Sequence, residues 1–344
     1  MRAPERVPDQ QLHGRVIASG FVPHPLITNP HLQTLIPFFR PLPPLPLTVE
    51  RVELPDGDFV DLGWCVGTRQ HAAILRQPPP GPLAVLLHGL TGGFESKYAR
   101  GLARVLLAMG WRAVILKFRG AGPEPNRLAR HYHHGDTEDL RELLAQLHAQ
   151  EPSTELFAVG WSLGANVLLK YLGEEGAAAP LKAAVGVCAP FQLKPCAQQL
   201  RTGFSRLYQY HLLTELRDMV RRKHARVALP VDLAEVARCK DFFEFDNLVT
   251  SRLNGFRDAE DYYARASSGA YLGGIARPVL AIHAKDDPFM TPDIVPDARR
   301  LPPDVTIELC EYGGHVGFMG AGKGLAPSWW LEERIPEYLR SMAR

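Results

Sequence analysis

The sequence has few cysteines and no long apolar run. Five of its 344 residues are cysteine, an odd and widely spaced set without a Cys-x-x-Cys pair. This argues against a disulfide framework and predicts buried free thiols in a reducing compartment. No stretch reaches the roughly 18 apolar residues that span a bilayer, and residues 1–11 are charged and polar where a secretory signal needs an apolar run. We therefore expect a cytoplasmic protein that does not insert into membranes.

An excess of charge of one sign is also missing. The 39 Lys and Arg residues nearly balance the 37 Asp and Glu residues, which leaves a net charge of +2. Nucleic-acid-binding proteins need a basic stripe or face, so we expect no nucleic-acid partner. The near-neutral charge leaves room for a small, weakly charged or apolar substrate.

Nucleotide and metal motifs are weak. There is no Walker A sequence, and Gly120-Ala121-Gly122 is too short for the dinucleotide fingerprint. His131 and His134 have helical i, i+3 spacing, with His133 and Asp136 close by, but no second ligand pair of the metalloenzyme type accompanies them. The sequence therefore predicts neither a cofactor nor a metal.

The first 50 residues are rich in proline, which fixes φ and removes a hydrogen-bond donor. We expect residues 1–50 to pack over the surface of the core rather than to pair in a central sheet. Strand patterns at 48–54 and 59–66 flank Asp56-Gly57, a combination that predicts a β-hairpin.

From residue 83 onward, short apolar runs alternate with helical patterns. The predicted strands are 83–87, 113–118, 156–159, 183–189, 279–283 and, as the last one, 305–310; the predicted helices include 96–109, 137–150 and 165–172. Strands that are apolar on both faces and separated by helices indicate an α/β fold, with a mostly parallel sheet covered by helices on both faces.

Residues 191–275 break this rhythm with many charged and aromatic residues. We interpret them as a helical lid insertion between two parts of an α/β core, 51–190 and 276–344. We expect their aromatic side chains to pack within the lid rather than to contact substrate.

The sharpest local signal is Gly160-Trp161-Ser162-Leu163-Gly164, between an apolar strand pattern and a helix. This context predicts a nucleophile elbow, in which a strained turn exposes the Ser162 hydroxyl. The glycines let neighbouring backbone approach, and the helix directs its free N–H groups toward a developing oxyanion. The alternative is a serine that stands between two glycines by chance.

A nucleophilic serine needs a base and an acid that orients the base. In this architecture they follow in the order Ser, Asp or Glu, His. Asp286 and Asp287 follow the strand pattern 279–283, and His315 lies in a glycine-rich loop after the last one. We predict His315 as the base and Asp287, which directly precedes a proline, as the acid. Asp286 is the alternative acid, and a purely structural histidine is the alternative for position 315.

An oxyanion hole needs two backbone donors, one just after the nucleophile and one from a loop after an earlier strand. Leu163 supplies the first, and Leu90 in the loop after 83–87 is the predicted second. His88, at the end of that strand, is interpreted as a structural hydrogen-bonding residue rather than a base.

These motifs together resemble the YheT-like branch of the α/β-hydrolase fold, a group of esterases related to animal hydrolase-domain lipases and yeast medium-chain ethyl-ester enzymes. The resemblance runs in family order from about residue 25 to near the C-terminus. The matching segments are 29–34, 54–59, 118–120, 124–127, 160–164, 283–289 and 313–318. The resemblance implies a charge-relay serine hydrolase that acts on carboxylic esters. Family members are cytosolic or anchored by an N-terminal helix, which we do not find here.

The sequence thus predicts a serine carboxylic-ester hydrolase that works through an acyl-enzyme on a small-molecule ester of short to medium chain length. One alternative is an acyltransferase that makes esters from the acyl-enzyme and an alcohol. The other is a non-catalytic scaffold or binding protein with the same fold. The oligomeric state stays open.

Overall fold

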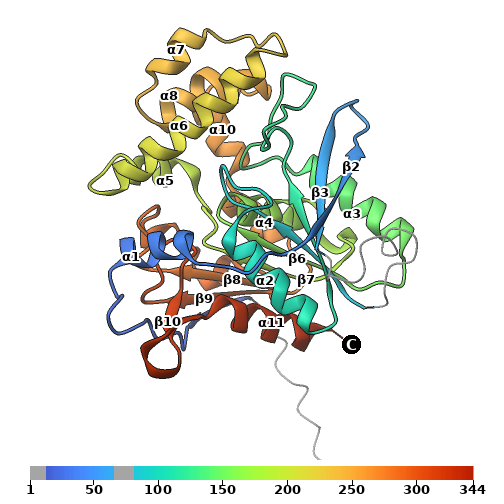
Figure 1. The fold of residues 1–344 in the computed structure, drawn as a ribbon, viewed down its shortest axis with the longest axis vertical. Helices are drawn as coiled ribbons and strands as arrows, with labels where there is room; N and C mark the ends of the chain where they lie inside the picture. Colours follow the sequence, from blue (N-terminus) through green and yellow to red (C-terminus); the bar gives the residue numbers. More distant parts are fainter. Residues whose placement is uncertain (1–12, 66–80, 344) are drawn as a thin grey trace, which may run out of the picture.

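A nine-stranded sheet forms the centre of the computed structural model, which describes residues 13–65 and 81–343 (Figure 1). Its strand order is β1-β9-β8-β7-β6-β4-β5-β3-β2. The strands are β1 (Arg15–Ala18), β2 (Leu47–Glu53), β3 (Phe59–Cys65), β4 (Leu83–Leu87), β5 (Arg112–Lys117), β6 (Leu156–Trp161), β7 (Leu181–Val187), β8 (Val279–Ala284) and β9 (Val305–Cys310). The β2–β3 and β3–β5 pairs are antiparallel, and all other neighbours in this sheet are parallel.

Helices cover both faces of this sheet. Every residue of β4, β6 and β8 is buried, which explains their continuous apolar sequences. Four helices pack around the sheet, namely α2 (Lys97–Ala108), α3 (Glu138–Gln150), α4 (Leu163–Glu175) and α11 (Leu331–Met342). Helix α2 contacts α11, whereas α3 contacts α4. The predicted α/β class and the predicted β2–β3 hairpin are confirmed.

The two ends of the chain contain elements that the sequence patterns did not predict. The expectation that residues 1–50 do not pair in the central sheet is wrong for β1, which contains no proline and pairs with β9 at the sheet edge. The proline-rich segment also contains the helix α1 (Pro30–Leu35) and the 3₁₀ turn η1 (Ile36–Phe39). The expectation that β9 is the last strand is wrong, because β10 (Met319–Ala321) and β11 (Pro327–Trp329) follow it as a separate two-stranded sheet. These strands have only three or four residues, too few to show an alternation pattern.

Between β7 and β8 the chain leaves the sheet and forms mainly helices, drawn in yellow and orange at the top of Figure 1. They are α5 (Leu193–Gln199), α6 (Ser205–His224), α7 (Leu233–Arg238), α8 (Phe242–Phe245), the π-helical turn η3 (Asp246–Thr250), α9 (Ser251–Leu253), α10 (Ala259–Ala266) and the 3₁₀ turns η4 (Ser268–Ala270) and η5 (Leu272–Gly274). Many aromatic side chains of this insertion are buried, including Tyr262 and Phe245. Among the described residues, no helix combines the length and apolarity needed to cross a membrane.

Candidate active site

Ser162 lies at the turn between β6 and α4, as the sequence predicts. Its backbone adopts φ 53° and ψ −116°, a strained conformation for a residue with a side chain. The Ser162 amide donates to the Val187 carbonyl at 2.8 Å and so holds the turn against β7. A Cβ atom on Gly164 would lie 2.4 Å from the Leu87 carbonyl oxygen. Glycine is therefore required there for the elbow to pack against the end of β4.

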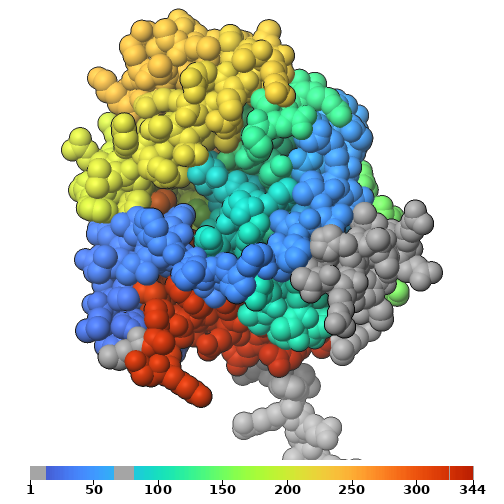
Figure 2. Space-filling model, viewed as in Figure 1, coloured from blue at the N-terminus to red at the C-terminus, as the bar shows by residue number. Residues whose placement is uncertain are grey.

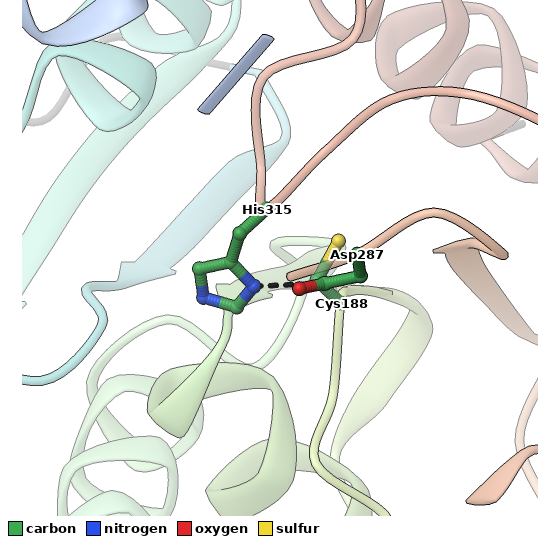
Figure 3. A group of neighbouring side chains, drawn as sticks. All are labelled: Cys188, Asp287 and His315. Carbon is green, nitrogen blue, oxygen red and sulfur yellow. Dashed lines mark hydrogen bonds and ion pairs between the residues drawn. The ribbon is translucent and has the colours of Figure 1, made fainter. Parts of the chain in front are cut away.

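Two hydrogen bonds connect the three side chains that the sequence singles out. Ser162 Oγ lies 2.9 Å from His315 Nε2, and His315 Nδ1 lies 2.8 Å from Asp287 Oδ2. Figure 3 shows the Asp287 carboxylate facing the His315 ring. The other Asp287 oxygen accepts from the Phe289 amide at 2.8 Å, and the Phe289 ring stacks on His315 at 4.0 Å. The carboxylate and the imidazole are therefore both fixed, and the imidazole reaches the serine.

The neighbouring Asp286 has a different contact. Its Oδ1 accepts from the Gly314 amide at 2.9 Å, and its Oδ2 is buried without a partner among the described residues. Burial raises the pKa of Asp286 above its usual value. The geometry thus gives Asp287 the contact with His315 and gives Asp286 a contact with the loop backbone.

The pKa of Asp286 predicts how stability changes in Asp286→Asn. A carboxyl group whose pKa is higher in the folded than in the unfolded protein stabilises the fold at low pH, and this stabilisation is lost as the pH rises. Each unit of such a shift is worth about 1.4 kcal/mol. We expect the free energy of unfolding of the asparagine variant, relative to the wild type, to increase between pH 4 and pH 7. Denaturant titrations at both pH values measure this, and an equal difference at both would contradict it.

In the first part of the loop after β4, residues 89–93, the Leu90 amide alone has a hydrogen without an acceptor in the described part of the chain. The Gly89 amide donates to Tyr98 Oη at 2.8 Å, and the Thr91 amide donates to Tyr132 Oη at 3.0 Å. The next two amides, of Gly92 and Gly93, donate to the Gly89 carbonyl and to Ser96 Oγ. Among the described residues, the Leu90 amide has no acceptor, and Leu90 lines the same cavity as Ser162. Leu163 begins α4, where the first N–H groups have no acceptor within the helix.

Ser162 and His315 face a cavity of about 1030 Å³. Its walls are mostly apolar, with Phe38 and Phe39 of η1 on one side and Tyr208 and Leu212 of α6 on another. In Figure 2, a hollow lies between the blue N-terminal segment and the yellow helical insertion, the two parts that supply these residues. The cavity is at the upper end of the size range of small-molecule sites, about 300–1,000 Å³.

Comparison with known proteins gives the family. Residues 82–321 match the family model described as the alpha/beta hydrolase fold. The protein YheT of Escherichia coli (strain K12) is 44% identical over 325 residues, which cover 94% of this chain and 93% of YheT. The chain belongs to the YheT-like branch of the α/β-hydrolase family. This membership makes it a hydrolase of that superfamily.

Two further proteins are similar to this α/β hydrolase. The phospholipase ABHD3 of Homo sapiens is 29% identical over 337 residues, which cover 96% of this chain and 81% of that protein. The solved structure of a Pyrococcus furiosus esterase superposes with a TM-score of 0.56 at 15% identity and covers 97% of this chain and 98% of that one. The similarity to the Pyrococcus furiosus structure shows a shared fold.

His88 and His131, which the sequence also singles out, form no hydrogen bond with the Ser162, His315 or Asp287 side chains. His88 is buried, its Nδ1 donates to the Gly89 carbonyl at 2.7 Å, and its Nε2 accepts from the Phe118 amide at 3.2 Å. Burial lowers the pKa of His88 to about 4, so the ring is neutral at pH 7. This is the structural role that the sequence predicts. His131, with both ring nitrogens buried and unpartnered, forms no metal-ligating group with His134 among the described residues.

Within the described residues, one group of three side chains has the residue types and spacing of a metal site. It consists of Cys188, Asp287 and His315, whose ligand atoms lie within 4.8 Å of one another (Figure 3). Two of its members already form the hydrogen-bonded pair beside Ser162. Burial and the nearby Asp287 carboxylate raise the pKa of the Cys188 thiol, and Sγ approaches the Gly314 carbonyl at 3.9 Å. The group therefore belongs to the site already described.

Sequence reasoning missed the residues that hold the His315 loop. Thr34 Oγ1 accepts from the His315 amide at 2.9 Å and donates to the Pro30 carbonyl at 2.7 Å. The Gln33 side chain donates to the Met319 carbonyl at 2.9 Å and accepts from the Met319 amide at 2.6 Å. Both side chains come from α1, in the segment 29–34 that resembles the family. The available signal was the match of this segment to the family, and nothing in its pattern singles out Gln33 or Thr34.

This contact predicts the effect of Thr34→Val. The His315 loop contains strained backbone, with φ 57° at Val316 and 44° at Phe318, so its hydrogen bonds determine where the imidazole lies. A buried amide that loses its acceptor costs about 1–3 kcal/mol. We expect the free energy of unfolding of the valine variant to fall by that amount. We also expect kcat to fall about tenfold, a loss that corresponds to the energy of one such hydrogen bond. Thr34→Ser keeps the hydroxyl and is the control; equal losses in both variants would contradict this role.

Proposed function

We propose that this chain is a serine carboxylic-ester hydrolase that works through an acyl-enzyme. The observation that carries the proposal is the continuous hydrogen-bonded series Ser162–His315–Asp287, which opens onto a large apolar cavity. An activated serine of this kind attacks acyl carbonyl groups. The cavity walls favour the apolar acyl part of an ester over a charged substrate.

In the first half of the proposed reaction, Ser162 Oγ forms a bond to the ester carbonyl carbon while its proton moves to His315 Nε2. The Asp287 carboxylate keeps Nδ1 protonated and stabilises the imidazolium. The Leu90 and Leu163 amides donate to the oxyanion. When the tetrahedral intermediate collapses, the alcohol leaves with the proton from Nε2, and the acyl group stays on Ser162.

In the second half, water attacks the acyl-enzyme and gives its proton to His315 Nε2. Collapse of the second tetrahedral intermediate breaks the bond to Ser162 Oγ, which takes the proton back as the carboxylic acid leaves. The same base thus serves both halves, and the enzyme returns to its starting state.

The helical insertion 191–275 is proposed to act as a lid over this site. The support is that Tyr208, His211 and Leu212 of α6 line the same cavity as the loop after β4. The Tyr208 ring also packs on Phe289, which in turn stacks on His315. The aromatic residues of the insertion therefore divide between internal packing and the cavity wall.

A panel of p-nitrophenyl esters with acyl chains from acetate to laurate tests the proposal. We expect hydrolysis that is greatest for short- to medium-chain esters. Adding increasing concentrations of ethanol separates the hydrolase from the acyltransferase, because an acyltransferase would form ethyl ester at the expense of free acid. A protein that is inert across the panel and is not labelled by a fluorophosphonate would be a non-catalytic scaffold, and the proposal would be wrong.

A further inference from the structure

Two tyrosines hold the loop that carries the proposed oxyanion donor. Tyr98 Oη accepts from the Gly89 amide at 2.8 Å, and Tyr132 Oη accepts from the Thr91 amide at 3.0 Å. These are the amides immediately before and after that of Leu90. The two phenols therefore fix the peptide groups on both sides of the Leu90 amide, the one amide among residues 89–93 that has no acceptor in the described part of the chain.

The loop needs such contacts because its own backbone, with a hydrogen bond from the Gly92 amide to the Gly89 carbonyl, determines its shape only in part. It contains Gly89, Gly92 and Gly93, and glycine adopts many backbone conformations at little cost. Thr91 has φ 57°, a left-handed conformation that is unfavourable for a β-branched residue. Such a conformation persists only where the surrounding contacts impose it, and the hydrogen bond to Tyr132 is a contact of this kind.

Both rings pack against another aromatic ring. Tyr98 packs against Trp161, the residue before the nucleophile, with ring centroids 4.9 Å apart. Tyr132 is buried and stacks on Phe118 at 5.6 Å, with 7° between the ring planes. Burial raises the pKa of both phenols, so each stays neutral at the pH of an esterase assay. Each acceptor is therefore held by ring packing, and Tyr98 packs directly beside the Ser162 turn.

We propose that Tyr98 and Tyr132 are positioning residues that aim the Leu90 amide at the oxyanion. The inference rests on the proposed function, because it concerns the same reaction. If the Leu90 amide points in the wrong direction, the substrate still binds, because its neutral carbonyl oxygen gains little from this hydrogen bond. The transition state is stabilised less, because there the same oxygen becomes negatively charged and depends on the hydrogen bond.

Tyr98→Phe and Tyr132→Phe test this, since each removes one acceptor and keeps the ring. Losing an oxyanion donor outright costs about 10²–10³ in kcat, so we expect each variant to lose about tenfold in kcat, with KM within about twofold. Tyr271→Phe is the matched control, because it also removes a tyrosine hydroxyl that forms a hydrogen bond with the backbone. Tyr271 Oη donates to the Arg265 carbonyl at 3.0 Å. It should retain the wild-type kcat.

A second measurement distinguishes positioning from general loosening of the fold. Trifluoromethyl ketones form a tetrahedral adduct whose oxyanion occupies the same position as in the transition state. We expect their affinity to fall by the same factor as kcat/KM in the two variants, and the pH dependence of kcat/KM to stay unchanged. Wild-type kcat in both variants, or lost activity with unchanged ketone affinity, would overturn the inference. If instead the wild-type protein neither hydrolyses esters nor binds the ketone, the proposed function itself fails.

Discussion

Replacing Ser162 with alanine is expected to lower kcat for p-nitrophenyl ester hydrolysis by about 10⁶-fold, the loss typical of removing a serine nucleophile. The reason is that Ser162 Oγ is the group within hydrogen-bond distance of His315 Nε2, at 2.9 Å, and it faces the cavity. Covalent labelling by a fluorophosphonate should disappear at the same time. Rate assays and intact-mass spectrometry of the labelled protein measure both effects.

The control for this variant is Ser341→Ala. Ser341 is exposed and donates only to the Tyr338 carbonyl in the C-terminal helix. It should retain wild-type hydrolysis and labelling. If the alanine variant at 162 folds normally and still reacts with the fluorophosphonate at the wild-type rate, another residue is the nucleophile and the proposed mechanism is wrong.

The second large effect is expected for Asp287→Asn. A carboxamide can turn its NH₂ group toward His315 Nδ1, which would favour the tautomer with the proton on Nε2, facing the serine. Its neutral charge also gives no stabilisation to the imidazolium. In a serine hydrolase relay, this change lowers kcat by about 10⁴-fold while the geometry is kept. Steady-state kinetics at pH 7 and pH 9 would measure the loss.

Asp286→Asn is the matched comparison, because the two aspartates are adjacent and the substitution is the same. The carboxamide oxygen of this variant can still accept from the Gly314 amide, as Asp286 Oδ1 does at 2.9 Å. We expect its kcat to stay within about tenfold of the wild type, since no charge next to His315 Nδ1 is lost. A larger loss at 286 than at 287 would reverse the assignment of the acid.

The central part of the fold could be predicted because its signals are local. The residues of β4, β6 and β8 are buried on both faces, so each appears in the sequence as an unbroken apolar run. The elbow likewise combines a strand, a serine between glycines and a helix within a few residues. The order of Ser162, Asp287 and His315 then follows from the order of the strands.

The parts that could not be predicted depend on contacts between distant segments. Strand β1 pairs with β9, so Arg15 lies beside Thr306, and no pattern within four residues indicates such a partner. Thr34 supports the His315 amide in the same way, across 281 positions of sequence. These contacts exist only once the sheet has formed, and they explain why the proline-rich segment is part of the site.

The predicted role of the Leu90 amide as an oxyanion donor could be derived from the sequence only in part. The sequence identifies the loop after β4 but not which of its amides is available to a ligand. That depends on Tyr98 and Tyr132, which come from two other segments and occupy the amides on either side. To find an available amide, each backbone N–H group must be matched with its acceptor, which requires the three-dimensional structure.

The measurement that tests the central claim most directly is rapid acid quenching of the protein with a p-nitrophenyl ester, followed by peptide mass spectrometry. The account predicts an acyl group on Ser162 in the wild type, formed in a burst equal to the enzyme concentration when deacylation is slow. It also predicts a much slower burst in Asp287→Asn. Turnover accompanied by an acyl group on a different residue would contradict the account.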